Sequence, residues 1–155
     1  MKILITIDYS DTAQYVTEKG YAFAQAMNAQ VILLHVTTDA GYYAATAYTP
    51  LVGYTGYIDI NAKDLYANDA IKRASQAYLN KIKVDLKDDS IQTVVAEGDY
   101  ADVIIEEATK NNVEVIVMGS HSRRWLENII MGSVTEEVLR HSIIPLYIIP
   151  TRKRD

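Results

Sequence analysis

The chain has 155 residues, a length typical of one domain, and we treat residues 1–155 as a single domain. Hydrophobic residues make up 49% and charged residues 23%, which excludes the compositions typical of disordered chains. The net charge of -5 argues against a nucleic-acid partner, because affinity for nucleic acids comes largely from Lys and Arg side chains that neutralise phosphates. With no cysteine, the chain can form no disulfide, thiolate metal site or thiol nucleophile.

The N-terminal sequence MKILITIDYSD turns acidic after a few apolar residues, so it lacks the length and cleavage site of a signal peptide. Elsewhere no apolar run approaches the roughly 18 residues that a membrane-spanning helix needs. These features predict a cytoplasmic protein without a membrane partner.

Short apolar runs alternate with stretches of helical periodicity along the chain. Strands are predicted at 1–8, 31–36, 91–96, 113–118 and 143–149. Four helices are predicted between them: one from a Ser10 N-cap to Met27, one from Leu65 to Ile82, one from an Asp99 N-cap to Asn111, and one at about 134–141. Strands that alternate with helices predict an α/β fold with a mostly parallel sheet and helices on both faces, because parallel neighbours require right-handed crossovers.

The segment 39–59 interrupts this alternation with 21 residues that carry five tyrosines and no charge between the terminal aspartates. Such a long connection is typical of a mobile surface loop, a lid or a partner-binding surface. The sequence leaves these three alternatives open.

Residues 118–138, MGSHSRRWLENIIMGSVTEEV, contain two Gly-Ser pairs and follow a predicted strand. In open parallel sheets ligands bind beyond the carboxyl ends of the strands, and amides of a glycine-containing bend and a helix start can bind a phosphate. Ser133 and Glu136 also form an S-x-x-E pattern, so part of this signal could serve only as a capping box for the following helix.

Familiar catalytic and nucleotide motifs are absent from the sequence. There is no G-x-x-x-x-G-K-[ST], no G-x-G-x-x-G after a strand, no H-E-x-x-H and no G-x-S-x-G. His35, His121 and His141 have no metal-ligand spacing, and His35, within a predicted strand, is expected to be a hydrogen-bonded core residue. The sequence therefore identifies no catalytic residue and no metal site.

Four segments of the chain resemble the universal stress protein family: ILITIDYSDTA, VILLHV, GDYADVIIEEA, and VIVMGSHS through IIMGSVTEEVLRHSIIPLYIIP. ATP-binding members of this family carry G-x-x-G, nine residues, then G-[ST]. Here Gly119 and the pair Gly132-Ser133 match the ends of the motif at this spacing, whereas Ser122 replaces the second glycine.

The resemblance implies a three-layer α/β sandwich with a five-stranded parallel sheet of order 3-2-1-4-5. The first and fourth strands are then neighbours, so that Asp8 and Gly119 would border one crevice. By resemblance, the adenosine part of a bound ATP, AMP or ADP, with or without Mg²⁺, would contact Asp8 and Val36, with Thr6 and Ile7 beside them. Met118 also belongs to the implied site. The phosphates would contact Gly119, Ser120, His121, Ser122, Gly132, Ser133 and Val134, and Arg123 and Arg124 would screen phosphate charge or remain solvated.

Ser122 decides how well this site would work. If its position requires a left-handed backbone, the Cβ costs about 1–2 kcal/mol, which is roughly a tenfold to thirtyfold loss of affinity. A hydroxyl that donates to a charged phosphate contributes a comparable amount, about 1.5–3 kcal/mol. We therefore expect a weakened or altered nucleotide site.

Family members commonly form homodimers through the last strand, which here runs from Ile143 to Ile149 and is predicted to be an exposed apolar edge. The leading hypothesis is a nucleotide-binding stress-response protein that acts as a regulatory or signalling homodimer. The alternative is a dimeric interaction module that does not bind nucleotide. Slow ATP hydrolysis is the least supported reading, because no general base is identifiable.

Overall fold

The computed structural model describes residues 1–38, 68–120 and 131–151, and the predicted alternation of strands and helices is confirmed there. The 39–59 segment and the 121–130 part of the motif lie outside the described residues. The elements, in chain order, are β1 (Lys2–Thr6), α1 (Ala13–Ala26), β2 (Gln30–Thr37), α3 (Asn68–Asp85), β3 (Gln92–Glu97), α4 (Tyr100–Lys110), β4 (Val115–Gly119), α5 (Ser133–His141) and β5 (Leu146–Ile149).

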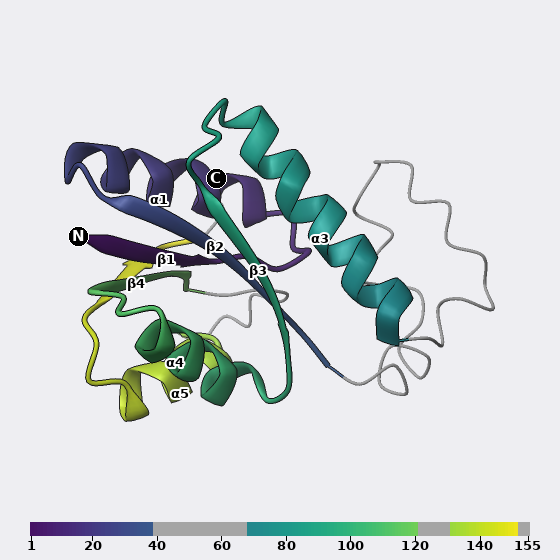
Figure 1. Cartoon of the computed structure of the whole chain (residues 1–155). Helices are drawn as coiled ribbons and strands as arrows, with labels where there is room; N and C mark the ends of the chain where they lie inside the picture. The colour runs from purple at the N-terminus through teal and green to yellow at the C-terminus, as the bar shows by residue number, and fades with distance from the viewer. Residues whose placement is uncertain (39–67, 121–130, 152–155) are drawn as a thin grey trace.

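The five described strands form one parallel sheet in the order β3-β2-β1-β4-β5, which confirms the expected order. Helices α1 and α3 cover one face of the sheet, and α4 and α5 cover the other (Figure 1). The direction of winding reverses between β1 and β4, which pair directly, with Ile5 opposite Val117. The carboxyl ends of these two strands therefore lie at the same edge of the sheet, and the chain leaves them toward opposite faces.

Alternate residues of each central strand pack into two separate cores. Ile3 and Ile5 of β1 pack on the α1 and α3 side, whereas Leu4 packs on the α4 and α5 side. All three side chains are completely buried. A strand buried on both faces needs apolar residues at every position, which is why the first strand has no polar alternation in the sequence.

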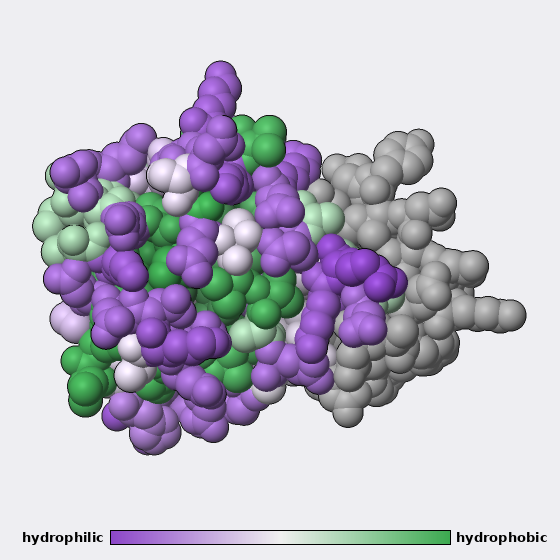
Figure 2. Space-filling view, viewed as in Figure 1, coloured by the Kyte–Doolittle hydropathy of each residue, from purple (hydrophilic) through white to green (hydrophobic). Residues whose placement is uncertain are grey.

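The two outer strands are less covered than the central ones. The middle residues of β3 are only half-buried. Figure 2 shows apolar side chains in the centre of the face over β3, surrounded by hydrophilic residues. At the other edge of the sheet, Tyr147 of β5 is 40% exposed and stacks on Phe23 of α1, with ring centroids 4.4 Å apart.

The helix starts partly differ from the predicted ones. Asp99 caps α4 as predicted, and its Oδ1 accepts hydrogen bonds from the amides of Ala101 (3.1 Å) and Asp102 (3.3 Å). The prediction of Ser10 as the cap of α1 was wrong, because the N-cap is Thr12 and the Ser10 hydroxyl donates to Asp8.

The capping box predicted at the start of α5 was also wrong. The N-cap is Gly132, Ser133 is the first helical residue, and the amide of Glu136 donates to the Gly132 carbonyl at 2.9 Å. The Glu136 carboxylate pairs instead with Arg140, one turn further along the helix, at 2.6 Å. The N-cap of α5 is therefore a residue without a side chain, so no cap side chain accepts from the first amides of the helix.

Candidate ligand-binding cavity

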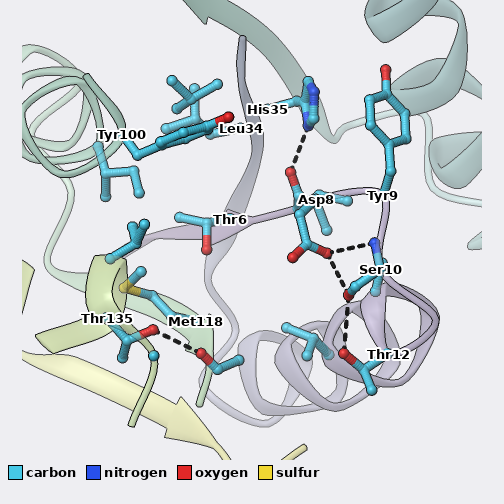
Figure 3. A pocket seen from close by; sticks show the side chains of 18 of the residues that line it. Thr6, Asp8, Tyr9, Ser10, Thr12, Leu34, His35, Tyr100, Met118 and Thr135 are labelled. Carbon is cyan, nitrogen blue, oxygen red and sulfur yellow. Dashed lines mark hydrogen bonds between the residues drawn. The ribbon is translucent and has the colours of Figure 1, made fainter. Parts of the chain in front are cut away.

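A cavity of about 340 Å³ lies at the carboxyl ends of β1, β2 and β4, beside the point where the strand order reverses. Its volume is within the range of about 300–1,000 Å³ that is usual for small-molecule sites. It is lined by Thr6, Ile7, Asp8, Tyr9, Ser10, Thr12, Ala13, Val16, Leu34, His35, Val36, Tyr100, Ile104, Met118, Gly119, Gly132, Ser133, Val134 and Thr135. Residues from five separate segments of the chain therefore converge on one space, as the side chains in Figure 3 show.

The turn between β1 and α1 places the Asp8 carboxylate in this cavity. Asp8 Oδ1 accepts from the Ser10 amide (3.0 Å) and from the Ser10 hydroxyl (2.6 Å), and the Ser10 and Thr12 hydroxyls share a further hydrogen bond of 3.0 Å. Both bonds from Ser10 use Oδ1. The carboxylate is thus held in one orientation, with Oδ2 available to accept from a ligand hydroxyl (Figure 3).

Helix α3 supports the same turn from outside the cavity. The Tyr9 hydroxyl shares a hydrogen bond of 2.9 Å with Oγ of Ser75, which is completely buried. The Tyr78 hydroxyl donates to the Asp8 carbonyl at 3.0 Å, and the rings of Tyr9 and Tyr78 are 4.8 Å apart. The turn is therefore fixed by side chains from an element almost 70 residues further along the chain.

His35 is a core residue with a polar contact, as predicted. It is 4% exposed, and its Nδ1 lies 2.7 Å from the carbonyl oxygen of Ile7. A carbonyl oxygen can only accept, so Nδ1 carries the proton. Its ring lies 4.5 Å from that of Tyr9, and both residues line the cavity.

The two glycine-bearing bends, 119–120 and 132–133, are held together by direct hydrogen bonds. The Gly132 amide donates to the Ser120 carbonyl at 2.7 Å, and the Thr135 hydroxyl donates to the Gly119 carbonyl at 2.9 Å. The Ser120 amide donates to the Ile149 carbonyl at 2.8 Å, which joins the first bend to the end of β5. The α5 N-terminus, with the positive end of its dipole, is thereby placed at the cavity next to the end of β4.

The structure brings together nine of the fourteen residues that were predicted for the site: Thr6, Ile7, Asp8, Val36, Met118, Gly119, Gly132, Ser133 and Val134. Ser120 does not line the cavity and instead joins the bends to β5. His121, Ser122, Arg123 and Arg124 lie outside the described residues.

Sequence reasoning missed several lining residues, among them Tyr9, Leu34, Tyr100, Ile104 and Thr135. Tyr100 could have been found from its position, because it directly follows the capping Asp99 at the start of a helix that leaves the carboxyl edge of the sheet. Among the described residues no group of three or more His, Asp or Glu side chains could hold a metal ion. No helix in the described part of the chain is long and apolar enough to cross a membrane.

The parallel sheet and the cavity at its reversal point define an open α/β protein of the class that binds ligands beyond its strand ends. A model of the universal stress protein family matches residues 1–150, and the chain belongs to this family. It is 29% identical over 153 residues to universal stress protein MJ0577 of Methanocaldococcus jannaschii, covering 96% of this chain and 93% of that protein.

Solved structures of the family share the fold. The MJ0577 structure superposes with a TM-score of 0.71 at 24% identity and covers 99% of this chain and 98% of its own. A universal stress protein in complex with cAMP gives a TM-score of 0.65 at 18% identity, covering 98% of both chains. One from Archaeoglobus fulgidus in complex with dAMP gives 0.59 at 16% identity, covering 96% of this chain and 97% of its own.

Proposed function

We propose that this protein binds an adenine nucleotide, ATP or its products ADP and AMP, and acts in the stress response by changing its state or partners. The observation that carries the proposal is the convergence of two glycine-bearing bends and the α5 N-terminus on a cavity that also holds the Asp8 carboxylate. The cAMP and dAMP complexes of relatives with the same fold support it. Since binding alone is enough for such a role, the proposal requires no covalent chemistry.

The cavity has the chemistry that a nucleotide needs at each of its parts. Asp8 can accept from ribose hydroxyls through Oδ2, and the carbonyl edge at Val36 lies beside an apolar space suited to the base. The region suited to phosphates is bordered by Gly119 and by Ser133 and Val134, whose first-turn amides have no acceptor within α5, and the helix dipole contributes about 0.3–1 kcal/mol there. A Mg²⁺ ion would arrive with the phosphates of the nucleotide.

Equilibrium binding tests this proposal. Calorimetry of nucleotide-free protein with AMP, ADP and ATP, each with and without Mg²⁺, is expected to give saturable binding. Asp8→Asn is expected to weaken it about tenfold or more, since a charge-assisted hydrogen bond contributes about 1.5–3 kcal/mol. Asp11→Asn is the matched control, because Asp11 is exposed on the same turn but does not line the cavity. Absence of binding at millimolar nucleotide would refute the proposal.

The second candidate function is a dimeric interaction module that does not bind nucleotide. It is favoured by the β5 edge, where Tyr147 is 40% exposed, and by Ile143, which lies before β5 and is 98% exposed. An apolar edge strand can pair with the same strand of a second copy, and we propose a homodimer on this basis. Ser122→Gly separates the two functions: binding that is gained only in the variant would favour the interaction module.

A further inference from the structure

Tyr100 occupies a distinct part of the cavity. It is the first residue of α4, and its ring extends from the helix start across the cavity toward β2 (Figure 3). Around it lie four buried apolar side chains that share one core cluster and also line the cavity: Leu34, Val36, Ile104 and Met118. Tyr100 packs against this cluster but remains only partly buried, so part of its ring borders the open space.

The two residues before Tyr100, Gly98 and Asp99, hold the start of α4 in place. The Gly98 amide donates to the Thr37 carbonyl at 3.0 Å, which joins the start of α4 to the end of β2. Gly98 has φ +145°, and Asp99 then caps the helix through the amides of the two residues that follow Tyr100. The Tyr100 backbone is therefore held beside the end of β2 before any ligand arrives.

The charged and hydrogen-bonding groups described above lie in other parts of the cavity than the apolar cluster around Tyr100. The Asp8 carboxylate and the Ser10 and Thr12 hydroxyls lie on the α1 side. The first residues of α5, Ser133 and Val134, line the cavity beside the end of β4, and their amides have no acceptor within the helix. A ligand with a flat, weakly polar end and an anionic end would therefore place the flat end against Tyr100.

We propose that Tyr100 stacks on the nucleobase and gives the cavity a preference for purine over pyrimidine nucleotides. The inference rests on the proposed nucleotide binding and adds a residue that selects the base. An aromatic ring attracts any base through its face, and removal of a stacking side chain commonly weakens binding about 5-fold to 150-fold. A purine has the larger face, so it loses more contact than a pyrimidine when the ring is removed.

Paired titrations of AMP and CMP test this inference. Tyr100→Leu keeps apolar volume but removes the ring, and it is expected to weaken AMP binding about tenfold and CMP binding less, so that the AMP to CMP affinity ratio falls. Tyr100→Phe and Tyr100→Trp should keep the wild-type ratio, since both retain an aromatic face. Tyr15→Leu is the matched control, because Tyr15 is 45% exposed on α1 outside the cavity.

The possible outcomes distinguish the proposed nucleotide binding from the stacking role of Tyr100. Wild-type protein that binds neither nucleotide refutes the proposed function and, with it, this inference. Wild-type protein that binds AMP while Tyr100→Leu keeps the same AMP to CMP ratio overturns the stacking role alone. If Tyr100→Leu lowers the affinities for AMP and CMP equally and also lowers the unfolding midpoint, Tyr100 has a purely structural role. That outcome would also overturn the stacking role.

Discussion

Replacing Gly98 with alanine tests whether the start of α4 is as constrained as the geometry indicates. The residue has φ +145°, and an added Cβ would lie 2.8 Å from Cγ2 of Val103. The backbone conformation costs an L-residue about 1–3 kcal/mol, and the steric overlap adds about 1–3 kcal/mol. Alanine also lowers the conformational entropy of the unfolded chain, which stabilises the folded state by about 0.4–1 kcal/mol. We expect Gly98→Ala to lower the free energy of unfolding by about 3 kcal/mol, or the melting temperature by about 6–12 °C.

Urea unfolding of four proteins separates these contributions: wild type, Gly98→Ala, Val103→Ala and the double variant. Val103→Ala alone should cost about 1.5 kcal/mol, because Val103 is 9% exposed and loses two methyl groups. If the overlap is real, the double variant should be more stable than the sum of the single effects predicts, by about 1 kcal/mol. A Gly98→Ala variant within about 0.5 kcal/mol of wild type would refute the reasoning, since that is the scatter of neutral surface changes.

Three further changes test other parts of the structure. Thr135→Val removes the hydroxyl that donates to the carbonyl at the end of β4, and nucleotide affinity measured by calorimetry should fall about fivefold, with Thr135→Ser retaining most of it. Hydrogen bonds from Ser90 and Tyr21 hold the pKa of Asp88 below its ordinary value, so their contribution to stability is present above the unfolded-state pKa and is lost as the pH falls through the folded-state pKa. Tyr21→Phe should therefore destabilise the protein more at about pH 7 than at about pH 3, and equal losses in urea unfolding at both would contradict this. Tyr147→Glu at the β5 edge should convert a dimer to a monomer in sedimentation equilibrium, whereas an unchanged mass would exclude pairing through this strand.

The order of the elements could be predicted because its causes are local in sequence. Residues 3–5 and 31–34 are continuous apolar runs, as strands buried on both faces require, and helical periodicity fills the intervals. The helix starts were less predictable, because a serine can satisfy several partners. Ser10 has the sequence signature of a cap, but the nearby Asp8 carboxylate accepts from its hydroxyl.

The candidate site was predictable where it depends on the ends of strands. Asp8 follows β1 and Gly119 is the last residue of β4, and these strands are neighbours once the order is known. Leu34 and Ile104 were missed because their exposure to the cavity depends on which face each side chain takes after β2 and α4 pack together. No local sequence pattern records that packing.

The hydrogen bonds from α3 to the β1–α1 turn determine when the cavity can form. The Tyr9 to Ser75 and Tyr78 to Asp8 contacts join residues 66 and 70 positions apart, so they form only after a long section of chain has closed. A fragment that ends before α3 would keep Asp8 but lose the contacts that fix its turn. A ligand bound at this carboxylate would then stabilise the assembled domain as a unit rather than one segment of it, and melting temperature would rise with ligand concentration.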